Sequence, residues 1–385
     1  MTLRVGFLGH RFMGRAHANA LARLPMFFPD APETERHVLV GRDEAALAEH
    51  ADQLGFAGTA TDWRDAIDVV DVLYNLAPNF LHPEPSIAAL DADVHVLCEK
   101  PMAPTLAEAE RMAEAARTSD AAAGVGFNYR FVPAIRLARE LIAAGELGDI
   151  RQFRGRYLQD WLVDPSAPWS WRNDAELAGS GALGDLGAHT FDLARFLVGD
   201  APGGGEPERV SGHLRTFVEE RPAGDSGSDG SGAGGRGTGE PETRPVTVDD
   251  AYSAQVAFSG GAMGTFEASR VAPGHENDQT VAVHGTHGSL RFSLERLNEL
   301  EVRGAGDRGY ETVLVTDESD PYVDAWWPPG HVLGWEHTFV HESYEFLGAA
   351  SGDGGFRPDF EDGLAVQRVL DAVERSDAAG EWVPA

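Results

Sequence analysis

Residues 3–24 constrain the fold of this chain more than any other stretch. Residues 3–8 (LRVGFL) predict a buried strand, residues 9–14 (GHRFMG) a glycine-bounded turn, and residues 15–24 a helix. This order begins the βαβ unit that binds dinucleotides, in which the pyrophosphate lies against the N–H groups of the helix N-terminus. Arg11 stands where the fingerprint has its central glycine, so we expect its side chain to lie along the phosphates instead.

Strand-like and helix-like segments continue to alternate up to residue 127. The segments predicted after the first helix are, in chain order, 37–41, 44–54, 69–74, 81–90, 94–98, 105–117 and 122–127. Such alternation is typical of a parallel, doubly wound α/β sheet with helices on both faces. We therefore predict that residues 1–125 form a dinucleotide-binding α/β domain.

Residues 126–385 have a different pattern and are predicted to form a second, α+β domain. After a helix at 133–144, short β-like runs separated by turn residues indicate a mostly antiparallel sheet. The strands are expected at 152–158, 252–258, 262–269, 279–284, 289–292 and 311–315, and the later helices at 188–197, 334–347 and 360–373. Residues 223–240 are largely glycine, serine and acidic residues, so we expect a disordered surface insertion there.

Lys100 is the only lysine among the 31 basic residues of the chain. Arginine replaces lysine wherever only positive charge is needed, but not where a compact amine must approach one atom as a point donor. Lys100 follows the predicted strand 94–98, and ligands of open α/β sheets bind at the carboxyl ends of the strands. We therefore interpret Lys100 as a functional residue.

A second group of candidate residues lies at the start of the predicted helix 188–197. Asp185 and His189 are four residues apart, and residues at that spacing share one face of a helix. A histidine with a pKa near neutrality is a suitable proton acceptor for an alcohol that is being oxidised. The same pattern also fits a structural helix cap beside a core histidine. It therefore supports a catalytic role only in combination with Lys100.

The end of the second predicted strand bears on the choice of cofactor. An acidic residue about 20 positions after the glycine turn binds the ribose 2′-OH of NAD, but Arg42 occupies that region here. We expect Asp43 to cap the helix at 44–54 instead of facing the ribose. The pattern favours NAD(P) with a preference for NADP, whose 2′-phosphate would pair with Arg42.

Five motifs, in this order along the chain, together resemble those of the Gfo/Idh/MocA oxidoreductases, the family of glucose–fructose oxidoreductase and inositol dehydrogenase. They are GxxFMGRAH at 9–17, APNxxH at 77–82, CEKP at 98–101, FNYR at 127–130 and DxGxHxxD at 185–192. Residues 25–28, 157–161, 171–172 and 179–185 are similar to the levoglucosan dehydrogenase branch of that family. The resemblance implies a Rossmann domain followed by an α+β domain, with Lys100, Asp185 and His189 as the catalytic trio.

The motifs and the resemblance also give a set of expected binding residues, in which Glu99 would contact the nicotinamide side. The expected cofactor-binding residues are Gly9, Arg11, Phe12, Met13, Gly14, Arg42, Ala77, Pro78, Asn79, His82, Glu99, Lys100, Asn128, Trp171 and Arg172. The expected substrate-binding residues are Lys100, Tyr157, Gln159, Trp171, Arg172, Asp185, His189 and His337. We expect no metal, because His337 and His341 have helical spacing but lack a third ligand at convincing spacing.

These residues predict an NAD(P)-dependent dehydrogenase that acts on a secondary hydroxyl group of a sugar, anhydrosugar or polyol. His189 would take the hydroxyl proton while Lys100 stabilises the developing alkoxide, although the sequence leaves open which of the two is the formal base. Two alternatives remain open. One is a redox-neutral, NAD-dependent glycoside hydrolase on the same fold, and the other is a non-catalytic sugar or nucleotide sensor.

The charge of the chain restricts its partners. The 62 acidic and 31 basic residues give a net charge of −31, which disfavours binding to nucleic acid and to anionic membranes. The single cysteine, Cys98, fits a reducing compartment, and no apolar run has the length of a membrane span. We therefore expect a cytoplasmic protein with a surface adapted to high salt. We also expect a homo-oligomer, a dimer or tetramer.

The salt adaptation predicts how thermal stability depends on ionic strength. Mutual repulsion among the acidic residues destabilises the compact state, and salt screens that repulsion. The melting temperature should therefore rise as the salt concentration is increased towards molar values, which thermal melts across a salt series would measure. A melting temperature that is indifferent to salt would contradict the adaptation.

Overall fold

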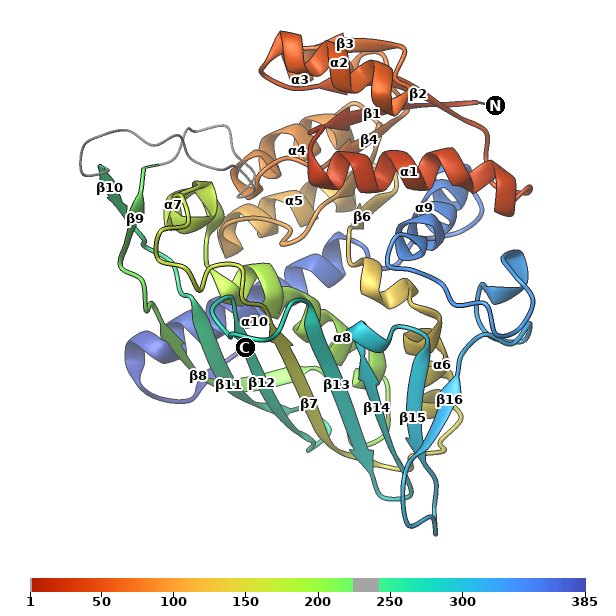
Figure 1. Cartoon of the computed structure of the whole chain (residues 1–385), viewed down its shortest axis with the longest axis vertical. Coiled ribbons are helices and arrows are strands. Elements are labelled where there is room, and N and C mark those ends of the chain that lie inside the picture. The colour runs from red at the N-terminus through yellow and green to blue at the C-terminus, as the bar shows by residue number, and fades with distance from the viewer. Residues whose placement is uncertain (1, 224–241) are drawn as a thin grey trace. The chain divides into compact units, whose positions relative to one another are not determined.

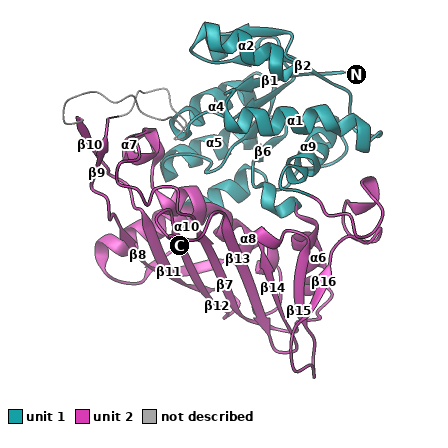
Figure 2. Ribbon diagram, in the orientation of Figure 1, with its two compact units in different colours: residues 1–131, 334–367 teal, residues 132–333, 368–385 magenta. Residues whose placement is uncertain are grey.

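The structure is a computed structural model that describes residues 2–223 and 242–385 (Figure 1). Except for Ala223, the insertion predicted at 223–240 lies outside the described residues. The chain forms two compact units, residues 1–131 with 334–367 and residues 132–333 with 368–385 (Figure 2). Residues 334–367 thus group with the first unit, whereas the sequence prediction assigned everything after residue 125 to the second domain.

The first unit contains a six-stranded sheet in the order β3-β2-β1-β4-β5-β6, and every neighbouring pair is parallel. This confirms the predicted doubly wound α/β fold. The strands are β1 (Leu3–Leu8), β2 (Thr34–Val40), β3 (Gly58–Ala60), β4 (Val72–Asn75), β5 (His95–Cys98) and β6 (Ala123–Val125). The helices are α1 (Phe12–Phe27), α2 (Glu44–Leu54), α3 (Trp63–Ile67), α4 (Pro83–Asp91), α5 (Leu106–Thr118) and α9 (His337–Ala350), with short 3-10 turns at Asn79–Leu81 and Asn128–Phe131.

Local sequence signals account for several of these boundaries. The Thr105 hydroxyl accepts a hydrogen bond from the Glu108 N–H and thereby caps α5. Pro83 and Pro85 lie in the first turn of α4. Backbone N–H groups in a first turn have no partner within the helix, so proline removes no hydrogen bond there. Strand β3 was not predicted, because Gly58–Ala60 is a three-residue edge strand without a large apolar side chain.

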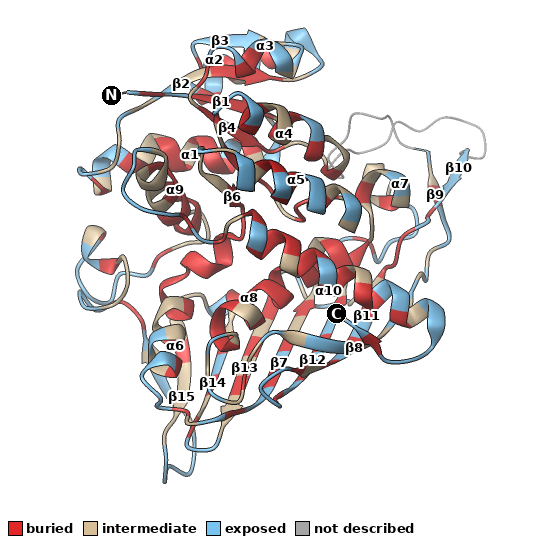
Figure 3. Cartoon of the chain, turned by 180° about the vertical axis from the view of Figure 1, so that it is seen from behind, coloured by how far each residue is buried: buried red, intermediate tan, exposed pale blue. Residues whose placement is uncertain are grey.

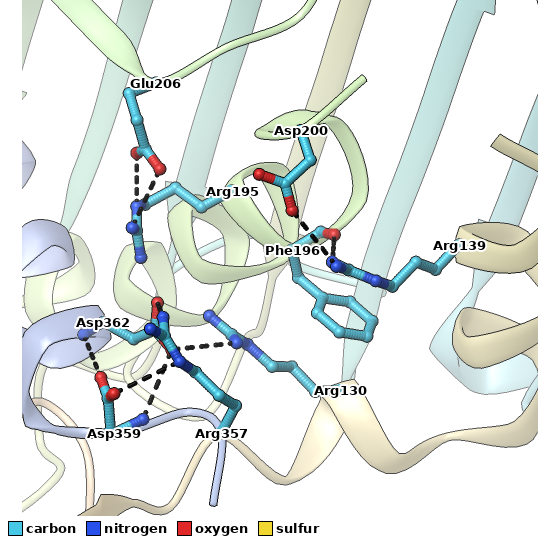
Figure 4. Close-up of polar contacts among 9 residues, drawn as sticks. All are labelled: Arg130, Arg139, Arg195, Phe196, Asp200, Glu206, Arg357, Asp359 and Asp362. Carbon is cyan, nitrogen blue, oxygen red and sulfur yellow. Dashed lines mark hydrogen bonds and ion pairs between the residues drawn. The ribbon is translucent and has the colours of Figure 1, made fainter. Parts of the chain in front are cut away.

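An ion-pair cluster joins residues 357–362 to Arg130, and its central pair, Arg130 with Asp362, is buried (Figure 4). Arg130 donates to Asp362 at 3.3 Å, and only 5% of either side chain is exposed. Arg357 donates to the other carboxylate oxygen of Asp362 at 3.2 Å. Asp362 lies near the start of α10 (Phe360–Ala379), so these contacts explain why the early part of α10 belongs to the first unit.

The second unit contains a nine-stranded sheet in the order β16-β15-β14-β13-β7-β12-β11-β8-β17. All its pairs are antiparallel except β7 with β12, which confirms the predicted mostly antiparallel sheet. The strands are β7 (Ile150–Leu158), β8 (Pro207–Arg215), β11 (Ala251–Phe258), β12 (Met263–Ser269), β13 (Asp278–Gly285), β14 (Ser289–Ser293), β15 (Glu299–Arg303), β16 (Glu311–Leu314) and β17 (Val383–Pro384). A separate hairpin pairs β9 (Glu220–Pro222) with β10 (Thr243–Pro245).

Burial alternates along the central strands of this sheet, so that one face is covered and the other is open. Helices α6 (Pro133–Ala143) and α8 (Ala188–Val198) belong to this unit, and α8 is buried at every position except Arg195 (Figure 3). Arg139 of α6 donates to the carbonyl of Phe196 near the end of α8, and Arg195 pairs with Glu206 at 2.6 Å (Figure 4). Within the described residues, no helix is long and apolar enough to span a bilayer.

Candidate functional site

The turn between β1 and α1 is shaped to hold an anion. Gly9 has a φ of +112°, and a Cβ there would lie 2.6 Å from the carbonyl oxygen of Leu76. A Cβ on Gly14 would lie 2.7 Å from the carbonyl oxygen of Gly9, so only glycine fits at either position. Among the described residues, no side chain caps the helix that follows, and its first turn carries no acidic residue. The free N–H groups and small residues fit the pyrophosphate of a dinucleotide.

The end of β2 carries the residues that would meet the ribose. The Asp43 carboxylate accepts hydrogen bonds from the N–H groups of Ala45 at 3.1 Å and Ala46 at 3.2 Å, which confirms that it caps α2. Arg42 is exposed, and in the described part of the chain no carboxylate pairs with it. The imidazole of His10 lies over Gly41, where a Cβ would be 2.8 Å from its Cδ2. This edge of the sheet therefore presents Arg42 without an acidic neighbour turned towards it.

His82 joins the loops that follow β4 and β5. Its Nε2 lies 2.8 Å from the carbonyl oxygen of Ala77, and its Nδ1 lies 2.9 Å from that of Pro101. Burial lowers the pKa of His82, although both carbonyls and the charge of Glu99 oppose the shift. Both ring nitrogens thus contact backbone, so the ring holds the Ala77–Pro78–Asn79 loop beside the segment that contains Lys100.

Asn75 at the end of β4 organises the same loop from the other side. Its amide nitrogen donates to the carbonyl oxygens of Leu81 and His82 and to the Ser86 hydroxyl, at 3.0, 3.1 and 3.1 Å. Its amide oxygen accepts from the Ala77 N–H at 3.4 Å. One buried side chain therefore fixes both ends of the loop that carries three of the expected cofactor-binding residues.

The backbone at Lys100 is fixed by its neighbour Glu99. The Glu99 carboxylate lies 2.9 Å from Nε2 of His17 in α1 and accepts from the Lys100 N–H at 3.2 Å. Both His17 and Glu99 are buried. A Cβ on Gly126 would lie 3.2 Å from the same carboxylate, which explains a small residue there. Glu99 thus reaches a partner in the first helix and fixes the backbone that carries Lys100.

The remaining first-unit candidates lie around α9. Asn128 donates from its amide to the Thr338 hydroxyl at 2.9 Å, and His337 contacts the backbone N–H of Gly334 at 3.0 Å. Nδ1 of His341 lies 2.9 Å from the carbonyl oxygen of Phe131, so its ring meets backbone. Among the described residues, no three histidine, cysteine or carboxylate side chains gather as metal ligands would.

In the second unit, Asp249 fixes the turn that precedes Asp185 and His189. Its carboxylate accepts from the N–H groups of Gly181 at 2.7 Å and Leu183 at 2.9 Å. Burial raises the pKa of Asp249, and the charge of Arg270 opposes that shift. A Cβ on Gly181 would lie 1.8 Å from the Asp249 carbonyl oxygen, so the approach requires glycine.

The segment that carries Asp185 is a π-helical turn, Leu183–Gly187, that runs directly into α8. The sequence prediction treated Asp185 and His189 as neighbours on a regular α-helix, and the wider turn changes that spacing. His189 is buried near the start of α8, and its ring centre lies 6.1 Å from that of Tyr157 on β7. A Cβ on Gly155 would lie 2.1 Å from Thr190, so glycine lets α8 approach β7 this closely.

Trp171 and Arg172 form a 3-10 turn with Asn173. The guanidinium of Arg172 lies 4.6 Å from the centre of the Trp171 ring. Burial lowers the pKa of Arg172, while the charge of Asp185 opposes the shift. Arg172 therefore lies within the electrostatic influence of a predicted catalytic carboxylate.

The two units hold different parts of the predicted set. The cofactor candidates of the first unit follow β1, β2, β4, β5 and β6, whose carboxyl ends share one edge of the parallel sheet. The second unit holds Tyr157, Gln159, Trp171, Arg172, Asp185 and His189, whereas His337 lies in the first unit. Sequence reasoning missed Asn75 and Asp249, which hold these groups in place. Asp249 gives little sequence signal, because it meets the turn before Asp185 only through folding.

Two family models and several known proteins match this chain, and together the matches cover nearly its whole length. Residues 3–127 match the model "Oxidoreductase family, NAD-binding Rossmann fold", and residues 135–291 match "GFO/IDH/MocA C-terminal domain". Levoglucosan dehydrogenase of Pseudarthrobacter phenanthrenivorans is 42% identical over 389 residues, which cover 99% of this chain and 97% of that protein. A levoglucosan dehydrogenase structure, in complex with NADH and levoglucosan, matches with a TM-score of 0.91 and 39% identity over 100% of this chain and 99% of the other. A D-xylose 1-dehydrogenase (NADP(+)) of Haloarcula marismortui is 34% identical over 194 residues, 50% of this chain and 52% of that protein.

Acidification should destabilise the protein partly through His82. The folded state lowers its pKa below the ordinary value of 6.5, so at lower pH the unfolded chain binds a proton that the folded chain binds less readily. The free energy of unfolding should therefore fall as the pH is lowered from about 6.5 through the folded-state pKa. The same direction holds for His10, His95, His284 and His337.

Denaturant unfolding at constant high salt, measured from pH 8 to about pH 5, would test this expectation. His82→Gln should flatten the pH dependence, because it removes one of the titrating groups. The control is His331→Gln at an exposed position, which should leave the slope unchanged. If the free energy of unfolding depends on pH equally steeply in wild type and in His82→Gln, His82 does not contribute to acid destabilisation.

Proposed function

Since this chain belongs to the Gfo/Idh/MocA family of oxidoreductases, we propose that it oxidises a secondary hydroxyl group of a neutral sugar, anhydrosugar or polyol. The observation that carries the proposal is the placement of the only lysine. Lys100 lies two residues after β5, at the edge where α/β sheets bind ligands. Its backbone is fixed by Glu99 and, through Pro101, by His82. Such fixation is what a preorganised catalytic group requires.

A nicotinamide dinucleotide fits the described residues of the first unit. The β1–α1 turn with Gly9, Arg11 and Gly14 would hold the pyrophosphate, and the loops at Ala77–Asn79 and Glu99 would line the nicotinamide end. The nicotinamide ring, when bound, accepts the hydride that leaves the carbinol carbon. The chain itself then has to orient the sugar, hold its oxygen and remove its proton.

His189 and Lys100 would share that work on one substrate oxygen. His189 takes the hydroxyl proton as the C–H bond breaks, and the Lys100 ammonium stabilises the negative charge that develops on the oxygen. Asp185 binds a neighbouring hydroxyl group and biases the charge of His189. The similarity to levoglucosan dehydrogenase supports this assignment of roles, since the two sequences are 42% identical over 99% of this chain.

A substrate panel tests the function directly. Purified protein is assayed with neutral sugars, anhydrosugars and polyols, with either cofactor, at low and high salt. Accumulation of the reduced cofactor with one or more of them is the expected result. Cleavage of glycosides without net reduction would instead support redox-neutral hydrolysis and overturn the dehydrogenase proposal.

Replacing Lys100 with arginine should abolish most turnover while cofactor binding persists. The planar guanidinium is bulkier than an ammonium and cannot occupy the same point beside the reacting oxygen. A loss of about 10²-fold or more in kcat is expected for removal of an oxyanion-type donor. Steady-state kinetics together with a fluorescence titration of the reduced cofactor measure both quantities. Activity within a few-fold of wild type would exclude the catalytic role.

We further propose that NADP is used at least as well as NAD. The support is that Asp43 is engaged in capping α2 while the exposed Arg42 has no acidic partner among the described residues. A guanidinium can pair with a 2′-phosphate in bidentate fashion. The levoglucosan dehydrogenase complex contains NADH, so this relative does not support the preference for NADP that we propose here.

Arg42→Ala should weaken NADP more than NAD. A charge-assisted pair contributes roughly 1.5–3 kcal/mol, about ten-fold to a hundred-fold in affinity. The measurement is KM for both cofactors in wild type and variant, with Arg64→Ala, an exposed arginine of the same unit, as the control. A strong preference of the wild type for NAD, or an equal change in KM for both cofactors in Arg42→Ala, would show that Arg42 does not bind the 2′-phosphate.

A further inference from the structure

Arg270, the residue that follows β12, holds two separate backbone segments of the second unit. It is buried, with only 1% of the residue exposed. Its Nη2 donates to the carbonyl oxygen of Asp249 at 3.0 Å, and its Nη1 donates to that of Arg172 at 3.4 Å. A guanidinium carries five N–H donors in a planar fork, so it can reach two acceptors at once. One buried side chain therefore joins the segment before β11 to the 3-10 turn that contains Arg172.

Asp249 extends this constraint to the turn that carries Asp185. The Asp249 carboxylate accepts from the N–H groups of Gly181 at 2.7 Å and Leu183 at 2.9 Å. The Gly181 carbonyl oxygen in turn accepts from the Asp185 N–H at 2.9 Å. A continuous series of hydrogen bonds thus runs from the Arg270 guanidinium through Asp249 to the backbone of Asp185.

The charge of Arg270 also favours the form of Asp249 that this turn requires. Burial raises the pKa of Asp249, and the positive charge of Arg270 opposes that rise. An ionised carboxylate offers only acceptor oxygens to the two N–H groups, whereas protonation converts one oxygen into an O–H donor. The packing is close, because a Cβ on Gly181 would lie 2.7 Å from Nη2 of Arg270. Arg270 therefore acts on the turn both by position and by charge.

A second arginine of this unit, Arg221 in β9, is buried to the same degree. It is 0% exposed and donates to the carbonyl oxygens of Leu162 at 2.7 Å and Asp164 at 2.9 Å. In both arginines Nε is buried and has no hydrogen-bond partner among the described residues. The two side chains thus match in burial and in the kind of partner. They differ in that the Arg270 guanidinium holds the segments of two candidate residues, whereas the Arg221 guanidinium holds the 162–164 loop.

We infer that Arg270 is a positioning residue for the proposed oxidation, because it fixes the backbone of two candidate residues. It holds Arg172 directly and Asp185 through Asp249. The inference deepens the proposed function and rests on it, since the two residues matter for turnover only if this unit binds the substrate. A misplacement of about 1 Å can lower the rate by about 10²-fold, so such support is a requirement of the reaction itself.

Arg270→Lys is the informative variant, because it keeps the positive charge and removes the planar fork. An ammonium is a compact point donor and cannot hold both carbonyl oxygens as the guanidinium does. With the sugar that wild type oxidises best, kcat at saturating cofactor should fall about ten-fold or more. The matched control is Arg221→Lys, which should keep the wild-type kcat even where its melting temperature falls. An equal loss of kcat in the two variants would overturn the inference.

Hydrogen–deuterium exchange measures the positioning itself, without any sugar. The network holds the N–H groups of residues 181, 183 and 185, so peptides that cover 171–185 should exchange about ten-fold faster in Arg270→Lys than in wild type. In Arg221→Lys the same peptides should exchange as in wild type. Unchanged exchange in Arg270→Lys would overturn the inference and leave the proposed function standing.

Asp249→Asn tests the same network from its other end, and it also serves where Arg270→Lys does not fold. The amide presents one acceptor oxygen in place of two, so one of the bonds to the turn is lost. The variant should lower kcat and speed exchange in the same peptides. If Arg270 acts through Asp249, the double variant should lower kcat little more than the stronger single variant does. Losses that multiply independently would overturn the action through Asp249.

The two measurements separate this inference from the proposed function. Faster exchange together with a lower kcat in Arg270→Lys, and neither change in Arg221→Lys, supports the inference. Faster exchange with an unchanged kcat overturns it and leaves the function standing, because the support would then be structural alone. A wild type that oxidises no sugar of the panel overturns the proposed function, and with it the role of Arg270 in turnover.

Discussion

The rest of the first unit's site depends on the contacts of one buried imidazole. His82 places its two ring nitrogens against the carbonyl oxygens of Ala77 and Pro101, and it thereby joins the loops after β4 and β5. A neutral imidazole has a single N–H, so His82 donates to one of these carbonyls and packs against the other, and the ring thereby joins the two loops. The backbone of Lys100 is also held by Glu99, whose carboxylate reaches His17. The only lysine of the chain therefore stands on a backbone with little freedom.

In the second unit, a buried carboxylate and two glycines fix the backbone around the candidate residues Asp185 and His189. Asp249 accepts two backbone N–H bonds at the turn before the π-helical segment, and Gly181 permits the close approach. Gly155 lets α8 lie directly on β7, which brings the ring of His189 near that of Tyr157. In both units the groups proposed for chemistry are supported by buried polar contacts to backbone, as preorganised sites require.

The fold and the motif residues could be predicted because their signals are local. The glycine turn, the strand–helix alternation and the cap at Asp43 each depend on a few consecutive residues, and all are present in the structure. The supporting residues could not be predicted, because their partners are distant in sequence. Asp249 meets Gly181 across 68 residues and Leu183 across 66. The grouping of residues 334–367 with the first unit is long-range in the same sense, and the π-helical turn at Asp185 leaves no periodic signal.

The central claim is that a hydride passes from a sugar carbon to the cofactor and remains there. A sugar deuterated at the oxidised carbon, incubated with the protein and oxidised cofactor, tests this most directly, with mass spectrometry of both products. The account predicts reduced cofactor that carries one deuterium per ketone formed. Deuterium retained in a cleaved sugar or lost to solvent, without accumulation of labelled cofactor, would contradict it.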